Sequence, residues 1–159
     1  MAYKKLVPQA NDLNKVIELA FKVSEGLDNY KEVADYFHFD ERQSSYYREA
    51  AEALGMVVRE KGRYRLTEIG NHLVRLPVEE RNLFIVGLVS DFDLVRHCLD
   101  TLRSTRCLSR KDIEPVITKE PHLTGSTVPR RAGSLAAWLR WISAVTGSFI
   151  EEKDGFGLN

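Results

Sequence analysis

Two segments that lie 92 positions apart in this 159-residue chain have nearly the same pattern. Each reads as the end of a helix, a glycine, an apolar pair, a charged turn, an aromatic residue and a leucine. The positions that correspond without a gap are Gly55, Val57, Val58, Glu60, Lys61, Tyr64 and Leu66 in the first segment and Gly147, Phe149, Ile150, Glu152, Lys153, Phe156 and Leu158 in the second. This repeat predicts that a helix followed by a β-hairpin occurs twice, with Lys61 and Gly62 as the first hairpin loop.

Three short helices are expected before the first hairpin. Asp12 caps the first, whose apolar residues recur at helical spacing until Gly26. The second spans 29–37, and Asp40 caps the third, which runs over 41–54. Helix, helix, turn, helix and hairpin is the order of a winged helix-turn-helix.

The second half of the chain is also expected to be rich in helix before its hairpin. Helices are predicted over 78–89, 92–102 and 109–117, the last interrupted by Pro115. A longer helix over 126–146 takes the place of the third helix.

The expected fold class is mainly α with small β-hairpin wings (α+β), arranged as a tandem winged helix-turn-helix. The first winged-helix unit spans 1–76, where a helix after the hairpin ends before Pro77, and the second spans 77–159. Asn159 corresponds to Thr67, which is expected to cap that helix. We therefore expect the second unit to be truncated and the chain to be the N-terminal piece of a longer polypeptide.

Charge and cysteine content exclude several classes of protein. The 23 Lys and Arg residues balance 23 Asp and Glu residues, so no global positive field draws the chain onto nucleic acid. Cys98 and Cys107 lack the spacing of a zinc site or a disulfide framework and are expected to be reduced and buried. No secretory signal is present, and the most apolar run, 83–89, is too short to cross a membrane. We expect a cytoplasmic protein with no membrane partner.

No catalytic motif is evident. The G-x-S-x-G, P-loop, G-x-G-x-x-G and H-E-x-x-H patterns are absent. Glu151, Glu152 and Lys153 form the E-x-K half of a metal-dependent nuclease motif, but Arg59, at the corresponding position of the first wing, cannot bind a metal. We expect no catalytic residue, metal site or cofactor in this chain.

The start of the third helix carries the side chains expected to read DNA, because that end approaches base edges in the major groove. The candidates are Arg42, Gln43, Ser45 and Arg48. Arginine pairs bidentately with guanine and glutamine with adenine. Alternatively, Arg42 and Arg48 pair with glutamates of their own helix. At least one of Tyr46 and Tyr47 is expected in the core.

Two further basic segments are candidates for DNA contacts. Lys61, Arg63 and Arg65 alternate along the first hairpin and so present one basic edge to phosphates. Alternatively, their charge only protects an exposed edge from pairing. In the second unit, the candidates near the start of the long helix are Thr124, Ser126, Thr127, Arg130 and Arg131. The alternative is a capped helix start whose arginines pair with acidic helices. The second wing is acidic and is not expected to bind phosphate.

A resemblance to a known module is carried by residues of both halves. They are Arg42, Gln43, Ser44, Ser45, Tyr46, Tyr47, Ala50, Ala51, Leu54, Gly55, Tyr64, Leu66, Thr67 and Gly70 in the first half and Thr127, Arg130, Arg131, Ala132, Trp138, Trp141 and Ile142 in the second. The first set resembles the winged-helix domain in DNA-recognition regions of type II restriction endonucleases, and the second is similar to the partner winged helix that follows it. This resemblance implies sequence-specific binding of double-stranded DNA by a non-catalytic recognition domain, with a nuclease domain elsewhere in the same chain.

The alternative function is a winged-helix protein–protein interaction or adaptor module without nucleic-acid contact. The two functions differ in whether Arg42, Gln43, Arg63, Arg130 and Arg131 converge on one surface or are held by intramolecular carboxylates.

Overall fold

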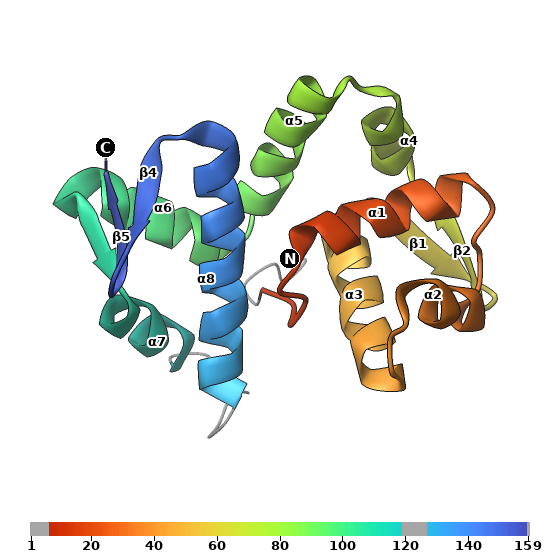
Figure 1. Ribbon diagram of the computed structural model, residues 1–159, viewed down its shortest axis with the longest axis horizontal. Coiled ribbons are helices and arrows are strands. Elements are labelled where there is room, and N and C mark those ends of the chain that lie inside the picture. The colour runs from red at the N-terminus through yellow and green to blue at the C-terminus, as the bar shows by residue number, and fades with distance from the viewer. Residues whose placement is uncertain (1–6, 119–126, 159) are drawn as a thin grey trace. The chain divides into compact units, whose positions relative to one another are not determined.

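The computed structural model describes residues 7–118 and 127–158. It is mainly helical with two small antiparallel sheets, which confirms the expected α+β class (Figure 1). None of the described helices has the length and apolar character that a bilayer span requires.

The chain divides into two compact units within a helix rather than between helices. The first unit is residues 8–84, and the second combines the N-terminal segment up to Val7 with residues from 85 onward. The sequence placed the boundary after residue 76. The structure places it inside α5 (Val78–Ser90), because the first half of this helix packs on the first unit, where Phe84 contacts the ring of His72 edge-on.

The first unit follows the predicted order of elements. Its helices and strands are α1 (Leu13–Ser24), α2 (Tyr30–Phe37), α3 (Glu41–Ala53), β1 (Val57–Glu60), β2 (Arg63–Leu66) and α4 (Glu68–Arg75). Asp12, Asp40 and Thr67 cap α1, α3 and α4 by accepting hydrogen bonds from backbone N–H groups of the first turn. The apolar face of α1 packs on α3 and β2.

The first hairpin has the turn that its sequence predicts. β1 and β2 pair antiparallel with Glu60 opposite Arg63, and Lys61 and Gly62 both have positive φ, 52° and 77°. Two consecutive left-handed residues make the tight turn whose twist matches that of the strands. Tyr64 faces the core, so Arg63 and Arg65 face solvent.

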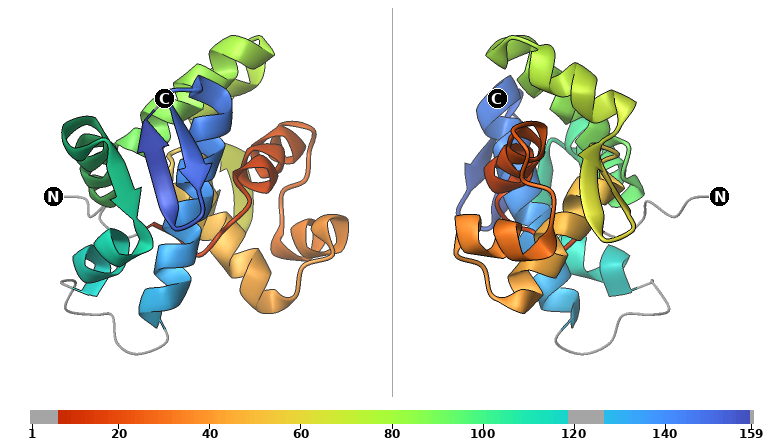
Figure 2. Two further views of the ribbon diagram at one scale, coloured as in Figure 1. Left: turned by 60° about the vertical axis from the view of Figure 1, so that its left-hand side comes forward. Right: turned by 90° about the vertical axis from the view of Figure 1, so that its right-hand side faces the viewer.

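The second unit contains the longest helix and a three-stranded sheet. Its elements are α6 (Asp93–Thr105), β3 (Cys107–Ser109), α7 (Arg110–Thr118), α8 (Thr127–Thr146), β4 (Phe149–Glu152) and β5 (Gly155–Leu158). β5 lies between β3 and β4 and is antiparallel to both (Figure 2). The core surrounds Trp138 of α8, whose ring meets Phe92 edge-on.

The structure extends the repeat beyond the hairpins. β4 and β5 fall on β1 and β2 at the predicted offset of 92, and α7 starts 80 positions after α2. Ser109, just before α7, pairs with Gly155, as Asn29 before α2 pairs with Arg63. The offset grows from 80 positions at α7 to 92 at β4. Twelve additional residues therefore lie between the start of α7 and the part of α8 that corresponds to α3. α8 itself begins six residues before the position that corresponds to the start of α3.

Two local expectations for the second unit were wrong. β3 was not predicted, and Pro115 lies inside α7 instead of interrupting it. Proline removes one helical hydrogen bond, but Ile113 and Ile117 on the same helix are buried, and their packing outweighs that loss.

The two cysteines are free, as expected, but only one of them is buried. Cys98 lies in the core on α6, whereas Cys107 is exposed on β3. Neighbouring residues of a strand face opposite sides, and Leu108 takes the inward position, so Cys107 faces solvent.

This difference predicts that one thiol per chain reacts in the native state. Burial raises the pKa of Cys98 to about 12, so its thiol is protonated and shielded at pH 8. Titration with a chromogenic disulfide reagent is expected to consume one equivalent rapidly in buffer and two in denaturant. The Cys107→Ser variant should lose the rapid equivalent, and a rapid second equivalent in the native wild-type chain would contradict the burial of Cys98.

Candidate nucleic-acid interface

Gln43 is already engaged at the start of α3. Its backbone N–H donates to Asp40 Oδ1 at 2.7 Å, and its side-chain Oε1 accepts from the Asp40 backbone N–H at 3.2 Å. These two bonds form a capping box. Bidentate pairing with adenine uses the same amide oxygen, so Gln43 would have to leave the capping box to read a base in the expected way.

Arg42 is exposed and is held by an aromatic residue rather than by a glutamate. Its Nε donates to the Tyr46 hydroxyl at 2.7 Å, with the guanidinium carbon 5.7 Å from the ring centroid. This contact fixes the side chain on the solvent side of α3 and leaves the terminal amino groups to act as donors. Tyr47 is the core tyrosine of the pair, as expected, and its hydroxyl accepts from the Asp12 backbone N–H.

Arg48 does not point into solvent as a reading residue would. Only 16% of its side chain is exposed, and it pairs with Glu52 at 3.3 Å and Glu49 at 4.0 Å. Ser45, three residues earlier, is half-buried. The glutamate pairing weighed from the sequence therefore holds for Arg48 and not for Arg42.

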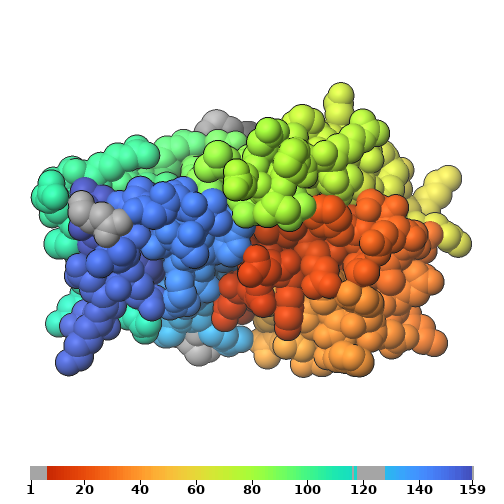
Figure 3. Space-filling view, turned by 45° about the horizontal axis from the view of Figure 1, so that its top comes forward, coloured from red at the N-terminus to blue at the C-terminus, as the bar shows by residue number. Residues whose placement is uncertain are grey.

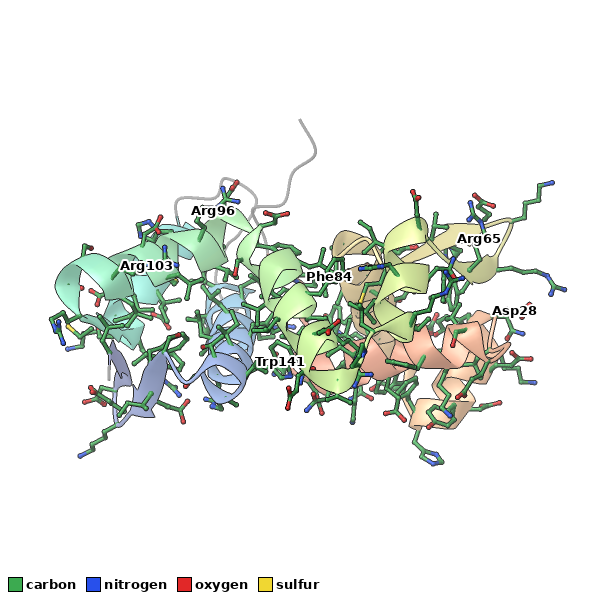
Figure 4. All side chains as sticks on the ribbon, turned by 90° about the horizontal axis from the view of Figure 1, so that it is seen from above. Asp28, Arg65, Phe84, Arg96, Arg103 and Trp141 are labelled. Atoms are coloured by element: carbon green, nitrogen blue, oxygen red, sulfur yellow. The ribbon has the colours of Figure 1, made fainter. Side chains whose placement is uncertain are left out.

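The basic edge of the first hairpin is partly neutralised within the unit. Arg63 pairs with Asp28 at 2.8 Å, and Arg65 makes two hydrogen bonds to the Glu60 carboxylate, at 3.0 and 2.6 Å. Arg65 lowers the pKa of that carboxyl. Figure 4 shows Arg65 and Asp28 toward the same end of the first unit.

Two other basic residues of the hairpin keep their charge exposed. Lys61 lies in the turn rather than on the strand face shared by Arg63 and Arg65, and Arg59 precedes it on β1. Neither has an ion pair within residues 7–118 and 127–158. Side chains of this hairpin project from the surface in Figure 3. Arg59 was not among the predicted contacts, although its position within the basic run was a signal for it.

The predicted cluster at the start of α8 divides into an exposed and an anchored arginine. Arg130 is exposed, whereas Arg131 is half-buried and donates from Nη1 to the Val7 carbonyl oxygen at 2.6 Å. Thr127 is the first residue of α8. Thr124 and Ser126 lie outside the described residues. Arg131 thus ties the N-terminal segment to the second unit and is not positioned as a DNA contact.

α8 differs in charge from its counterpart α3. α3 carries three glutamates and two arginines, whereas the twenty residues of α8 include three arginines and no carboxylate. Arg140, which sequence reasoning missed, is exposed, and its Nε donates to Glu151 of β4 at 2.6 Å. Arg140 could have been found from two signals in the sequence, namely the length of this helix and its lack of acidic residues.

The comparison with known families places the chain. The family model described as "Domain of unknown function (DUF7226)" matches residues 15–147. The chain belongs to the DUF7226 family. The match runs from α1 to the residue after α8 and therefore includes helices of both units. No curated protein and no solved structure matches the chain significantly.

The acidic residues of the second hairpin and the exposed basic side chains define the charged surface of this DUF7226 chain. Over residues 7–118 and 127–158, no three His, Cys, Asp or Glu side chains gather as a metal ion requires. On the second hairpin, Glu151 pairs with Arg140, while Glu152 lies across β5, over the backbone of Gly157. On α3, the first hairpin and α8, the exposed basic side chains include Arg42, Arg59, Lys61, Arg130 and Arg140.

Proposed function

We propose that this chain binds double-stranded DNA sequence-specifically, as the non-catalytic target-recognition domain of a restriction endonuclease. The observation that carries the proposal is α8, a long helix that follows α7, precedes a hairpin and carries arginines without any carboxylate. A helix in that place enters the major groove in a winged helix-turn-helix. A carboxylate on it would be repelled by the phosphates, so its charge favours this use.

The exposed side of α8 has the length needed to follow several base pairs. Arg130, Gly133, Arg140 and Ala144 are exposed and lie within about 80° around the helix axis at 100° per residue. Arg130 and Arg140 are about 15 Å apart along the axis at 1.5 Å per residue. That span corresponds to about four base pairs of B-DNA. We therefore assign base reading to α8 more than to α3, because α3 carries three glutamates and α8 carries no carboxylate.

The first hairpin supplies phosphate contacts in this proposal. Lys61 and Arg59 are exposed, positively charged and without ion pairs in the described part of the chain. Contacts of this kind position a protein on DNA but carry no base preference.

Selection from randomised duplex DNA at about 150 mM salt tests the proposal. We expect a defined motif that binds at least about a thousandfold more tightly than random DNA. Arg130→Ala should relax the preference at one base position at a cost of about 1 to 3 kcal/mol. Lys61→Ala should weaken motif and random DNA equally and reduce the slope of affinity against salt. No enrichment, together with no binding at low salt, would overturn DNA binding.

A second candidate function is a protein-interaction or adaptor module. The observation that favours it is that Arg48, Arg63 and Arg65 are held by carboxylates of their own unit. If the selection returns no motif, the exposed Ile150 of the acidic second hairpin is the first position to test, with an Ile150→Lys variant in partner capture.

A further inference from the structure

A groove runs between α7 and α8 in the second unit. Its cavity has a volume of about 220 Å³ and is lined by both helices. Drug-sized ligands occupy about 300 to 1,000 Å³, so this groove fits a smaller molecule. Ile113 of α7 and Ala132 and Ala136 of α8 give it an apolar floor.

Gly133 keeps the groove open in the middle of α8. A glycine inside a helix costs about 0.5 to 1 kcal/mol relative to alanine. Gly133 has helical φ, and no described atom lies within 4 Å of the position that a Cβ would occupy. Close packing therefore does not require glycine at this position, and a side chain there would project into the groove.

The polar part of the groove is predominantly cationic. Arg110 at the start of α7 and Arg140 of α8 both line it, with Glu114 as the single acidic side chain among the lining residues. Glu151 accepts from Arg140 Nε, which fixes the guanidinium and leaves its terminal amino groups as donors. Guanidinium groups bind carboxylates and phosphates through paired hydrogen bonds.

We propose that this groove binds a small organic anion, with the apolar body on the alanine floor and the carboxylate or phosphate between Arg110 and Arg140. The site lies within one unit and shares Gly133 and Arg140 with the exposed side of α8 described above. It does not depend on the proposed DNA binding, so each proposal can be disproved without affecting the other.

Titration of the ¹⁵N-labelled chain with phenyl phosphate and with benzoate, followed by NMR, tests the site. We expect saturable shifts of backbone resonances at Arg110, Gly133 and Arg140 with both anions. Neutral benzamide has the same ring without the charge and should produce none. Arg110→Gln should weaken binding of both anions by about tenfold, the loss of one charge-assisted hydrogen bond.

Two glycine variants separate filling of the groove from a general effect on folding. Gly133→Leu places a side chain in the cavity and should abolish the shifts. Gly87→Leu changes another helical glycine with open space around it, outside the groove, and should leave the shifts unchanged. Equal shifts with benzamide, unaltered binding in Gly133→Leu, or no saturable shift with either anion would overturn the proposal.

Discussion

Replacement of Trp138 by alanine is expected to lower the free energy of unfolding of the second unit by about 3 to 5 kcal/mol. Its side chain is fully buried at the centre of α8, and its ring centroid lies 5.3 Å from that of Phe92, at an interplanar angle of 87°. The variant loses both the burial of a large apolar surface and this edge-to-face contact, and it leaves a cavity.

Trp141→Ala provides the matched control, because Trp141 lies three residues further along the same helix but is half-buried. The chain has two tryptophans, so each variant keeps one as a fluorescent reporter of urea unfolding in the second unit. We expect the loss in Trp141→Ala to be clearly smaller. Equal losses in the two variants, or a loss below about 1 kcal/mol in Trp138→Ala, would show that α8 does not form the centre of this core.

Gly155→Ala is expected to destabilise the second unit by about 2 to 3 kcal/mol. Gly155 begins β5 with φ 156°, a conformation that residues with a Cβ rarely adopt. An added Cβ would lie 1.9 Å from the backbone carbonyl oxygen of Leu108, which belongs to the neighbouring strand β3. Strand β3 must therefore move away, and its pairing with β5 is weakened.

Gly133→Ala in the same unit should change stability in the opposite direction. This glycine is helical and has open space at the Cβ position, so alanine should raise stability by about 0.5 to 1 kcal/mol. Thermal or urea unfolding of the two variants, measured side by side by circular dichroism, checks the pair. A neutral Gly155→Ala would mean that β3 is not paired with β5 in solution.

The parts of the fold that sequence predicted well are those determined by nearby residues. Asp12, Asp40 and Thr67 cap helices through hydrogen bonds that reach at most three residues along the chain. The turn at Lys61 and Gly62 likewise depends on two residues that accept positive φ. Signals of this kind are visible in a single sequence.

The features that were missed depend on contacts between distant residues. β3 is a strand only because Cys107 pairs with Gly157, and a three-residue segment has no strand pattern of its own. The correspondence between α2 and α7 was not visible in the sequence, because the two helices occupy equivalent positions in their units but have different residues.

The same distinction applies to the candidate interface. Arginine and glutamine at the start of a helix have the right chemistry for DNA, but composition does not reveal which groups are already engaged. Gln43 is engaged in a capping box and Arg131 in a bond to a residue 124 positions away. Only the arrangement in space reveals these two contacts.

The assignment of Val7 to the second unit and of Pro8 to the first has a consequence for dissecting the protein. The backbone crosses from one unit to the other twice, once between Val7 and Pro8 and once inside α5. A proteolytic cut in α5 therefore separates residues from 85 onward from the rest of the chain, while Val7, which belongs to the same unit, stays on the other fragment. A fragment that starts at Ile85 lacks the carbonyl group that accepts from Arg131, so separate expression of the second unit requires a circular permutation that retains the N-terminal segment.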